Sequence, residues 1–158
     1  MNKFYLFLTT ILLCSCHVDY LSLGDSYVLI EDVVIAREKD KESHALEILI
    51  PDQVLNEDYD KSHIIAYQKP DSFTYRREQI DFYRSIPDST MHYQHKADSL
   101  EVLLDSMLKI RDCYWIIRKK DCKVFGPMTE SDFNRECKKR NIKLKMDKRY
   151  ERQYIRSY

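Results

Sequence analysis

The stretch "YWIIRKKDCKVFGPMTESDF", residues 114–133, contains two runs typical of β-strands and the beginning of a helix. The runs "YWIIRKK" and "KVFGPM" are rich in aromatic and β-branched residues, and polar residues separate them. We expect a hairpin that turns at Lys120 and Asp121 and that places Cys113 opposite Met128. This hairpin supplies two strands of an antiparallel sheet.

The residues after the hairpin predict a helix that packs on the same sheet. Thr129 and Asp132 have the three-residue spacing of a capping box, in which the side chains bind free amides at the start of a helix. We therefore expect a helix over about residues 130–140. Phe133 and Cys137 are four residues apart, so they would lie on the helix face turned toward the sheet.

The C-terminal part predicts a last strand and a basic tail. Asn141 can end the preceding helix in a left-handed conformation, and "IKLKMDK" then alternates strictly between apolar and polar residues. Residues 147–158 form the tail, and over residues 138–158 nine Lys or Arg stand against two acidic residues. Such a segment can meet phosphates, an acidic protein surface or anionic lipid headgroups, but we interpret it as a solvated face that balances an acidic body.

The first third of the mature chain reads as strands. The runs "SYVLI", "VVIA", "ALEILI" and "SHIIAYQK" each combine β-branched or aromatic residues, and the polar "NEDYDK" between the last two reads as a turn. Together with the later runs they predict an α+β fold, with an antiparallel meander of about six to seven short strands.

A helical insert is expected between the two groups of strands, over residues 72–112. Pro70 precedes it, and Pro87 with the cap-like residues 88–90 divides it into two helices. The second helix has apolar residues at spacings of three and four, which predicts one buried face. These residues are Ala97, Leu100, Leu103, Leu104, Met107 and Leu108.

The N-terminus has the layout of a secretory signal. The apolar run "FYLFLTTILL" follows Lys3, and it is too short for a transmembrane helix, which needs about 20 apolar residues. "LCSC" then resembles a bacterial lipobox, with Leu13 three residues before Cys16 and the small Ser15 directly before it. We expect residues 1–15 to be removed as a signal peptide and residues 16–158 to form one domain.

The lipobox resemblance implies that the thiol of Cys16 carries a diacylglyceryl group and that the new amino terminus is acylated, for example by palmitate. Two or more chains anchor a protein firmly in a membrane, whereas one binds marginally. The alternative is a plain secreted protein that is cleaved nearby.

The combination of this N-terminus with "DYLSLGDSYVLI", "YDKSHIIAYQKP" and "YWIIRKKDCKVFGPMTESDF" resembles a family of small bacterial lipoproteins of the Bacteroides type, a domain of unknown function. The resemblance covers most of the mature chain. It implies a location and an architecture, but it implies no activity and no catalytic residues. An insert such as residues 72–112 is then a plausible docking surface.

The cysteines of the mature domain predict neither a zinc site nor a disulfide framework. Besides Cys16 there are three, Cys113, Cys122 and Cys137, and none forms a CxxC pair. In the expected hairpin, Cys113 and Cys122 lie several rungs apart, beyond the reach of a disulfide. We expect three small, buried thiols.

One pair of short motifs resembles a hydrolase site. "GDSY" contains Ser26 and "DKSH" contains His63, as in the Gly-Asp-Ser and Asp-x-x-His blocks of a lipase and esterase family. Those enzymes carry the histidine block near the C-terminus and need further glycine and asparagine blocks for an oxyanion hole. With only Gly24 and Gly126 in the chain, we interpret both motifs as turns beside strands.

Three other patterns are weaker. Ser106 and Lys109 have Ser-x-x-Lys spacing inside the predicted second helix, so we interpret them as surface residues. His92, His95 and Asp98 lie at three-residue steps, where a solvated helix face is the simpler interpretation than a metal site. The chain contains no glycine-rich phosphate loop, and we expect no cofactor, no metal and no nucleic-acid partner.

The sequence therefore favours a non-enzymatic envelope lipoprotein, held to the membrane by lipid on Cys16, that binds another envelope protein. We expect the outer membrane, on either its periplasmic or its outward side. The alternatives are a hydrolase that acts on envelope lipid or glycan, and an inhibitor or immunity-type lipoprotein.

Overall fold

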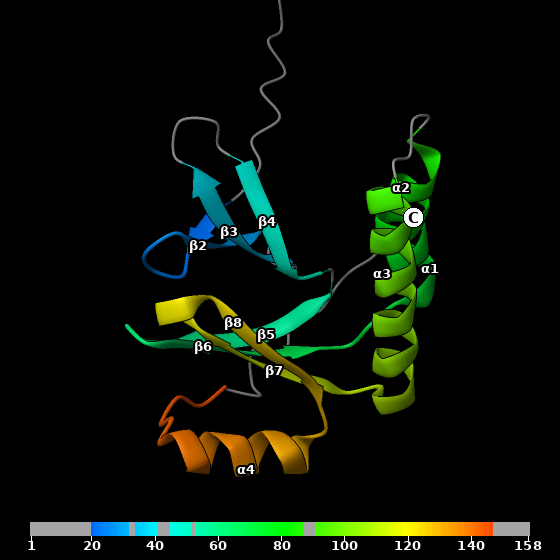
Figure 1. Ribbon diagram of the computed structural model, residues 1–158. Coiled ribbons are helices and arrows are strands. Elements are labelled where there is room, and N and C mark those ends of the chain that lie inside the picture. The colour runs from blue at the N-terminus through cyan, green and yellow to red at the C-terminus, as the bar shows by residue number, and fades with distance from the viewer. Residues whose placement is uncertain (1–19, 32–33, 41–44, 52, 87–90, 147–158) are drawn as a thin grey trace, which may run out of the picture.

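The computed structural model describes residues 20–31, 34–40, 45–51, 53–86 and 91–146, and it places their strands in two antiparallel sheets of four (Figure 1). Sheet A has the order β1-β2-β3-β4 and sheet B the order β5-β6-β7-β8. The α+β class and the antiparallel pairing are confirmed. The strands of sheet A are β1 (Tyr20–Ser22), β2 (Tyr27–Ile30), β3 (Val34–Asp40) and β4 (Ala45–Ile50). The strands of sheet B are β5 (Val54–Tyr59), β6 (His63–Gln68), β7 (Cys113–Arg118) and β8 (Lys123–Met128).

The meander is split into two sheets at Pro51, between β4 and β5. Pro51 is buried, and proline cannot donate to a strand ladder. Beyond this residue β5 pairs with β6 instead of continuing sheet A. The two sheets pack on each other, because residues from both share one core, such as Leu29 and Ile35 of sheet A with Ile64 and Ile117 of sheet B.

Strand β5 corrects the interpretation of "NEDYDK" as a turn. Residues 56–59 pair in register with β6, from Asn56 opposite Tyr67 to Tyr59 opposite Ile64. Their polar side chains are no obstacle, because strand pairing uses the backbone and the neighbouring strand overrides local preference. The turn itself is shorter, at residues 60–62.

The central strand β7 is buried on both faces, since all five residues from Cys113 to Ile117 are buried. One face contributes Trp115 and Ile117 to the core shared with sheet A. The other contributes Tyr114 and Ile116 to a second core under helix α4. A strand enclosed in this way reads as a continuous apolar run, which explains the "YWII" sequence.

The hairpin of β7 and β8 has the predicted register near its turn, with Arg118 opposite Lys123. Farther along, the register shifts by one residue, so that Tyr114, and not Cys113, lies opposite Met128. The shift falls at Gly126, where an added Cβ would lie 2.6 Å from the Trp115 ring. The predicted position of Cys113 was therefore wrong, because a β-bulge was not foreseen.

The helical insert is confirmed as a pair of helical segments between β6 and β7. The first consists of α1 (Ser72–Tyr75), a π-helical segment (Arg76–Ile80) and α2 (Asp81–Ser85); the second is α3 (Met91–Ile110). A π-helical turn places residues five apart on one side, and Tyr75 and Ile80 are both buried. In α3, Ala97, Leu104 and Met107 are buried as predicted, whereas Leu108 is exposed.

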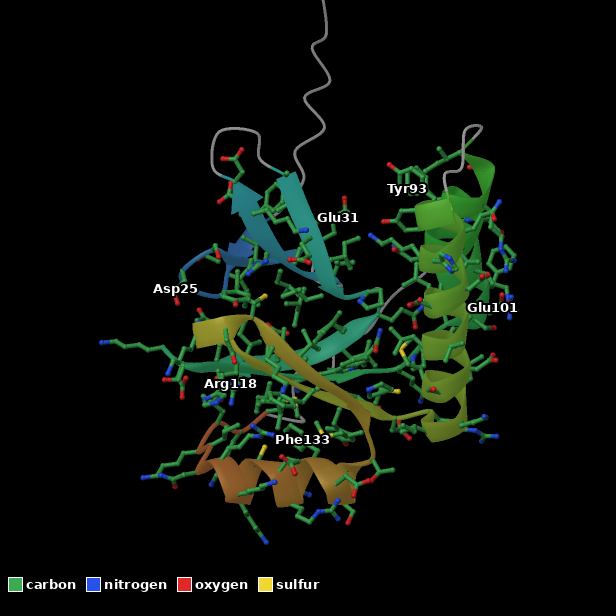
Figure 2. All side chains as sticks on the ribbon, viewed as in Figure 1. Asp25, Glu31, Tyr93, Glu101, Arg118 and Phe133 are labelled. Atoms are coloured by element: carbon green, nitrogen blue, oxygen red, sulfur yellow. The ribbon has the colours of Figure 1, made fainter. Side chains whose placement is uncertain are left out.

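Helix α4 (Glu130–Arg140) covers the outer face of sheet B as expected (Figure 2). The Thr129 hydroxyl accepts a hydrogen bond from the amide of Asp132 at 3.2 Å, and Asn141 ends the helix with a φ of 55°. Residues 142–146 alternate in burial as predicted but pair with no strand in the part that the structure describes. Ile142, Leu144 and Met146 pack beside Phe133.

Candidate functional site

Two of the regions singled out in the sequence lie outside the described residues. Cys16, the expected lipid-attachment residue, precedes the first described residue, Tyr20, and the basic tail over 147–158 follows the last, Met146. The expectations for both stay predictions. Within the described residues, no helix is both long enough and apolar enough to cross a membrane.

The two hydrolase-like motifs meet at Lys119, which joins the two sheets. The Lys119 ammonium donates to the carbonyl of Leu23 at 2.5 Å and to the carbonyl of Asp60 at 2.7 Å. The Tyr27 hydroxyl donates to the Lys119 carbonyl at 3.1 Å. Through its two carbonyl partners, the Lys119 side chain therefore links the turn before β2 to the turn before β6.

This link through Lys119 does not bring Ser26 and His63 together as a catalytic pair. Ser26 lies in the turn before β2 of sheet A and His63 begins β6 of sheet B, and their side chains form no hydrogen bond with each other among the described contacts. The Asp60 carboxylate accepts from the amides of Ser62 and His63 at 2.6 and 2.8 Å. Burial raises its pKa, but these amides outweigh that effect and hold the pKa below its ordinary value. Asp60 is thus part of the turn.

The weaker motifs lie on the surface of α3. The Ser106 hydroxyl donates to the carbonyl of Val102 at 3.0 Å within the helix, and Lys109 is exposed, as predicted. His95 and Asp98 are also exposed. In the described part of the chain, no three His, Cys, Asp or Glu side chains gather closely enough to hold a metal ion.

The three cysteines of the described domain are free thiols, as predicted, but the predicted burial holds fully for Cys113 alone. Cys113 is fully buried, and Cys122 and Cys137 are partly buried. Burial raises the pKa of the Cys113 thiol to about 12. A thiol in that state is a packing group and not a nucleophile.

A cleft with a volume of about 340 Å³ lies between β4 and the helical insert. We call it the β4 cleft. Figure 1 shows β4 facing the helical pair across this side of the molecule. The β4 wall carries Leu46, Ile48 and Leu49, and the helical wall carries Tyr83, Leu100 and Leu103.

Tyr75 of α1 also lines the β4 cleft and is 1% exposed. Its hydroxyl has no hydrogen-bond partner among the described residues. Burial raises its pKa to about 12, so the hydroxyl holds its proton at neutral pH. A buried donor without an acceptor costs about 1–3 kcal/mol.

The charged residues at the cleft give it a positive balance. Lys39 and Lys96 line it together with the single carboxylate of Glu47. The Glu47 carboxylate is already occupied, because Arg37 contacts it at 2.6 Å and Lys39 at 3.4 Å. Lys96 lies 4.6 Å from the centre of the Tyr83 ring and pairs with no carboxylate within the described residues. The free charge at the cleft is therefore cationic.

A second cavity, of about 390 Å³, opens on sheet B beside the start of α4. Tyr67 and Tyr114 form its aromatic floor, with ring centres 5.2 Å apart. The Tyr67 hydroxyl donates to the carboxylate of Asp112 at 2.7 Å. Its polar groups are already engaged, in contrast to Tyr75 in the β4 cleft.

The sequence predicted the insert as a docking surface, which stays a prediction, but it did not predict the cleft or its residues. The burial of Tyr75 could not be predicted, because a single tyrosine in a charged helical segment forms no periodic apolar pattern. The run "ALEILI" did carry one: of its four aliphatic residues, Leu46 and Ile48 are exposed by 39% and 46%. Such apolar residues on the solvent side of a strand were visible in the sequence as a departure from a polar outer face.

Comparison with protein families places the chain. A family model described as a protein of unknown function, DUF3997, matches residues 26–150. A comparison with curated proteins found no match, and neither did a comparison with solved structures. The match spans most of the chain and includes strands β2 to β8, the insert and α4. The chain belongs to the DUF3997 family of proteins of unknown function.

Proposed function

We propose that this protein is a lipid-anchored component of the bacterial cell envelope, most simply of the outer membrane, that binds another envelope protein and catalyses no reaction. The anchor is the lipid on Cys16. The contact region is the helical insert, and the observation that carries the proposal is the β4 cleft between the insert and β4.

The helical insert is fixed rigidly against the sheets, which supports a role in binding. Tyr75, Ile80, Leu104 and Met107 belong to the same core as both sheets. On the side of the insert away from the sheets, Glu101 accepts from Arg76 and Arg84, each at 2.6 Å (Figure 2). These ion pairs join the two helical segments. A preorganised wall loses little entropy on binding a partner.

The anchor would hold sheet A close to the membrane. Only three residues separate Cys16 from Tyr20, the first residue of β1. An extended chain covers about 3.3–3.6 Å per residue, so β1 would begin within roughly 14 Å of the lipidated cysteine. A partner would therefore be an envelope protein that reaches the membrane surface.

Two experiments in intact cells test the proposal. Metabolic labelling with a tagged palmitate should mark the wild-type protein and leave the Cys16→Ala variant unlabelled; equal labelling of both would reject the anchor. Cross-linking at native abundance, followed by purification and mass spectrometry, should recover one abundant envelope protein with the wild type.

The second experiment also addresses the hydrolase alternative. If no partner is recovered and a Ser26→Ala strain shows altered turnover of envelope lipid, the hydrolase alternative is supported and the binding role is rejected. Deleting the insert is unsuitable as a control, because residues 72–112 supply buried core side chains such as Leu104 and Met107.

A further inference from the structure

The β4 cleft follows the edge of a strand and not one of its faces. Successive side chains of a strand point to opposite faces of the sheet. Four successive residues of β4, 46–49, nevertheless all line the cleft. This is possible only if the cleft runs along the side of the strand, where both rows of side chains and the backbone between them border the same space.

That side of β4 is an open sheet edge. β4 pairs with β3, and no strand lies on its other side in the described part of sheet A. An edge strand presents unpaired N–H and C=O groups at every second residue, and these groups pair readily with another extended chain. The helical wall with Leu100 and Leu103 lies across the cleft and keeps the edge from being a flat, open surface.

The other polar features of the cleft define what the guest must carry. Tyr75 lines the cleft with a side chain that is almost completely buried, so it adds packing surface to the helical wall. The ammonium of Lys96 has no carboxylate partner among the described residues, so a guest with an acidic side chain complements it. The aliphatic walls accept apolar side chains.

We propose that the β4 cleft receives an extended segment of the partner protein, which adds to sheet A as a fifth strand beside β4. In this segment, apolar residues alternate with polar ones. The apolar residues pack against Leu100 and Leu103, and one acidic residue lies opposite Lys96. This inference rests on the proposed function, because it identifies where and how the envelope partner binds.

Site-specific cross-linking in cells tests the location. A photoreactive residue is placed in the full-length, anchored protein at Ile48 or Leu103 inside the cleft, and at Phe73 or Val102 on the outer surface of the insert, where both are 68% exposed. One short segment of one protein, captured from both cleft positions, is the expected result. Capture from the outer positions alone overturns the inference and preserves the proposed function. Capture from none of the positions opposes both.

Binding of a synthetic peptide that copies the captured segment tests the mechanism. Ile48→Glu and Lys96→Glu should each weaken binding roughly ten-fold or more. The matched changes Val102→Glu and Lys109→Glu on the exposed surface of α3 should leave it unchanged. Bound peptide should also slow hydrogen exchange of those amides among residues 46–49 that face away from β3. Peptide binding without slower hydrogen exchange in β4, or an equal loss of peptide affinity in the control variants, would overturn strand addition.

Discussion

The indole N–H of Trp115 donates a hydrogen bond of 2.8 Å to the side-chain oxygen of Gln68. Gln68 is completely buried, and its amide nitrogen donates in turn to the carbonyl of Pro51. Pro51 is the residue at which the chain leaves β4 for β5. One buried glutamine therefore connects the central strand of sheet B to the end of β4, and with it to the β4 cleft.

Replacing Gln68 with methionine should destabilise the protein strongly. The change retains the size of the side chain but leaves the Trp115 N–H and the Pro51 carbonyl without partners, at a cost of about 1–3 kcal/mol for each buried group. Urea unfolding measures the loss. The exposed Gln94→Met is the matched control, and equal midpoints for the two variants would contradict the role of Gln68.

Gly126→Ala should also lower the free energy of unfolding. Gly126 has a φ of 141°, which disfavours any side chain. The new Cβ would lie 2.6 Å from the Trp115 ring and 2.9 Å from the Tyr114 carbonyl. Overpacking of this kind costs about 1–3 kcal/mol. Thermal unfolding of the variant beside the exposed Lys120→Ala tests it, and an unchanged melting temperature would show that the bulge relaxes.

The three thiols should differ in reactivity while the protein is folded. The thiolate is the reactive form, and burial raises the pKa of Cys113 to about 12. At pH 8 we expect Cys113 to resist alkylation in the native state, as measured by peptide mass spectrometry. In urea without reductant, all three thiols should react, since the structure contains them unpaired. A cysteine that resists alkylation there would indicate a disulfide.

Stability should fall in alkaline solution, in part through Tyr75. The ordinary pKa of tyrosine is about 10, and burial raises that of Tyr75 to about 12 in the folded protein. Between these values the unfolded chain loses a proton that the folded protein retains, so the free energy of unfolding decreases as pH rises. Tyr75→Phe should reduce the decrease between pH 10 and 12. Parallel curves for the two proteins would show that Tyr75 does not contribute.

Glu101→Gln should loosen the helical insert without unfolding the sheets. Hydrogen bonds from Arg76 and Arg84 hold the pKa of Glu101 below its ordinary value, so the ion pairs are complete at neutral pH and are lost as pH falls through that lowered pKa. Hydrogen exchange at pH 7 should be faster over residues 72–85 in the variant. Asp98→Asn, whose carboxylate lies 3.9 Å from Arg84, should exchange like the wild type.

The local elements were largely predictable. A helix beginning after Thr129 and ending at Asn141 follows from side chains that bind their own backbone, and such contacts lie within a few residues of one another. The alternation over residues 142–146 likewise indicated which side chains are partly buried and which are exposed. Strand β5 escaped prediction, because its support comes from β6 and not from its own residues.

The site was harder to predict than the elements. The insert was expected as a docking surface, yet the cleft depends on a strand edge and two helical segments that are separated in sequence by as many as 57 residues, from Leu46 to Leu103. The hydrolase-like motifs show the converse. Tyr27 of the first motif and Asp60 of the second both bind Lys119, which neither motif contains.

The sequence by itself determined the α+β class, the helical insert, the free thiols and the capped helix α4, because periodicity, capping and residue type act over short distances. Only the tertiary structure decided that the strands form two sheets, that β4 is an edge strand in the described part of sheet A, and that the Tyr75 hydroxyl has no partner among the described residues. Those features arise from packing between residues far apart in the chain, for which a single sequence contains no local signal.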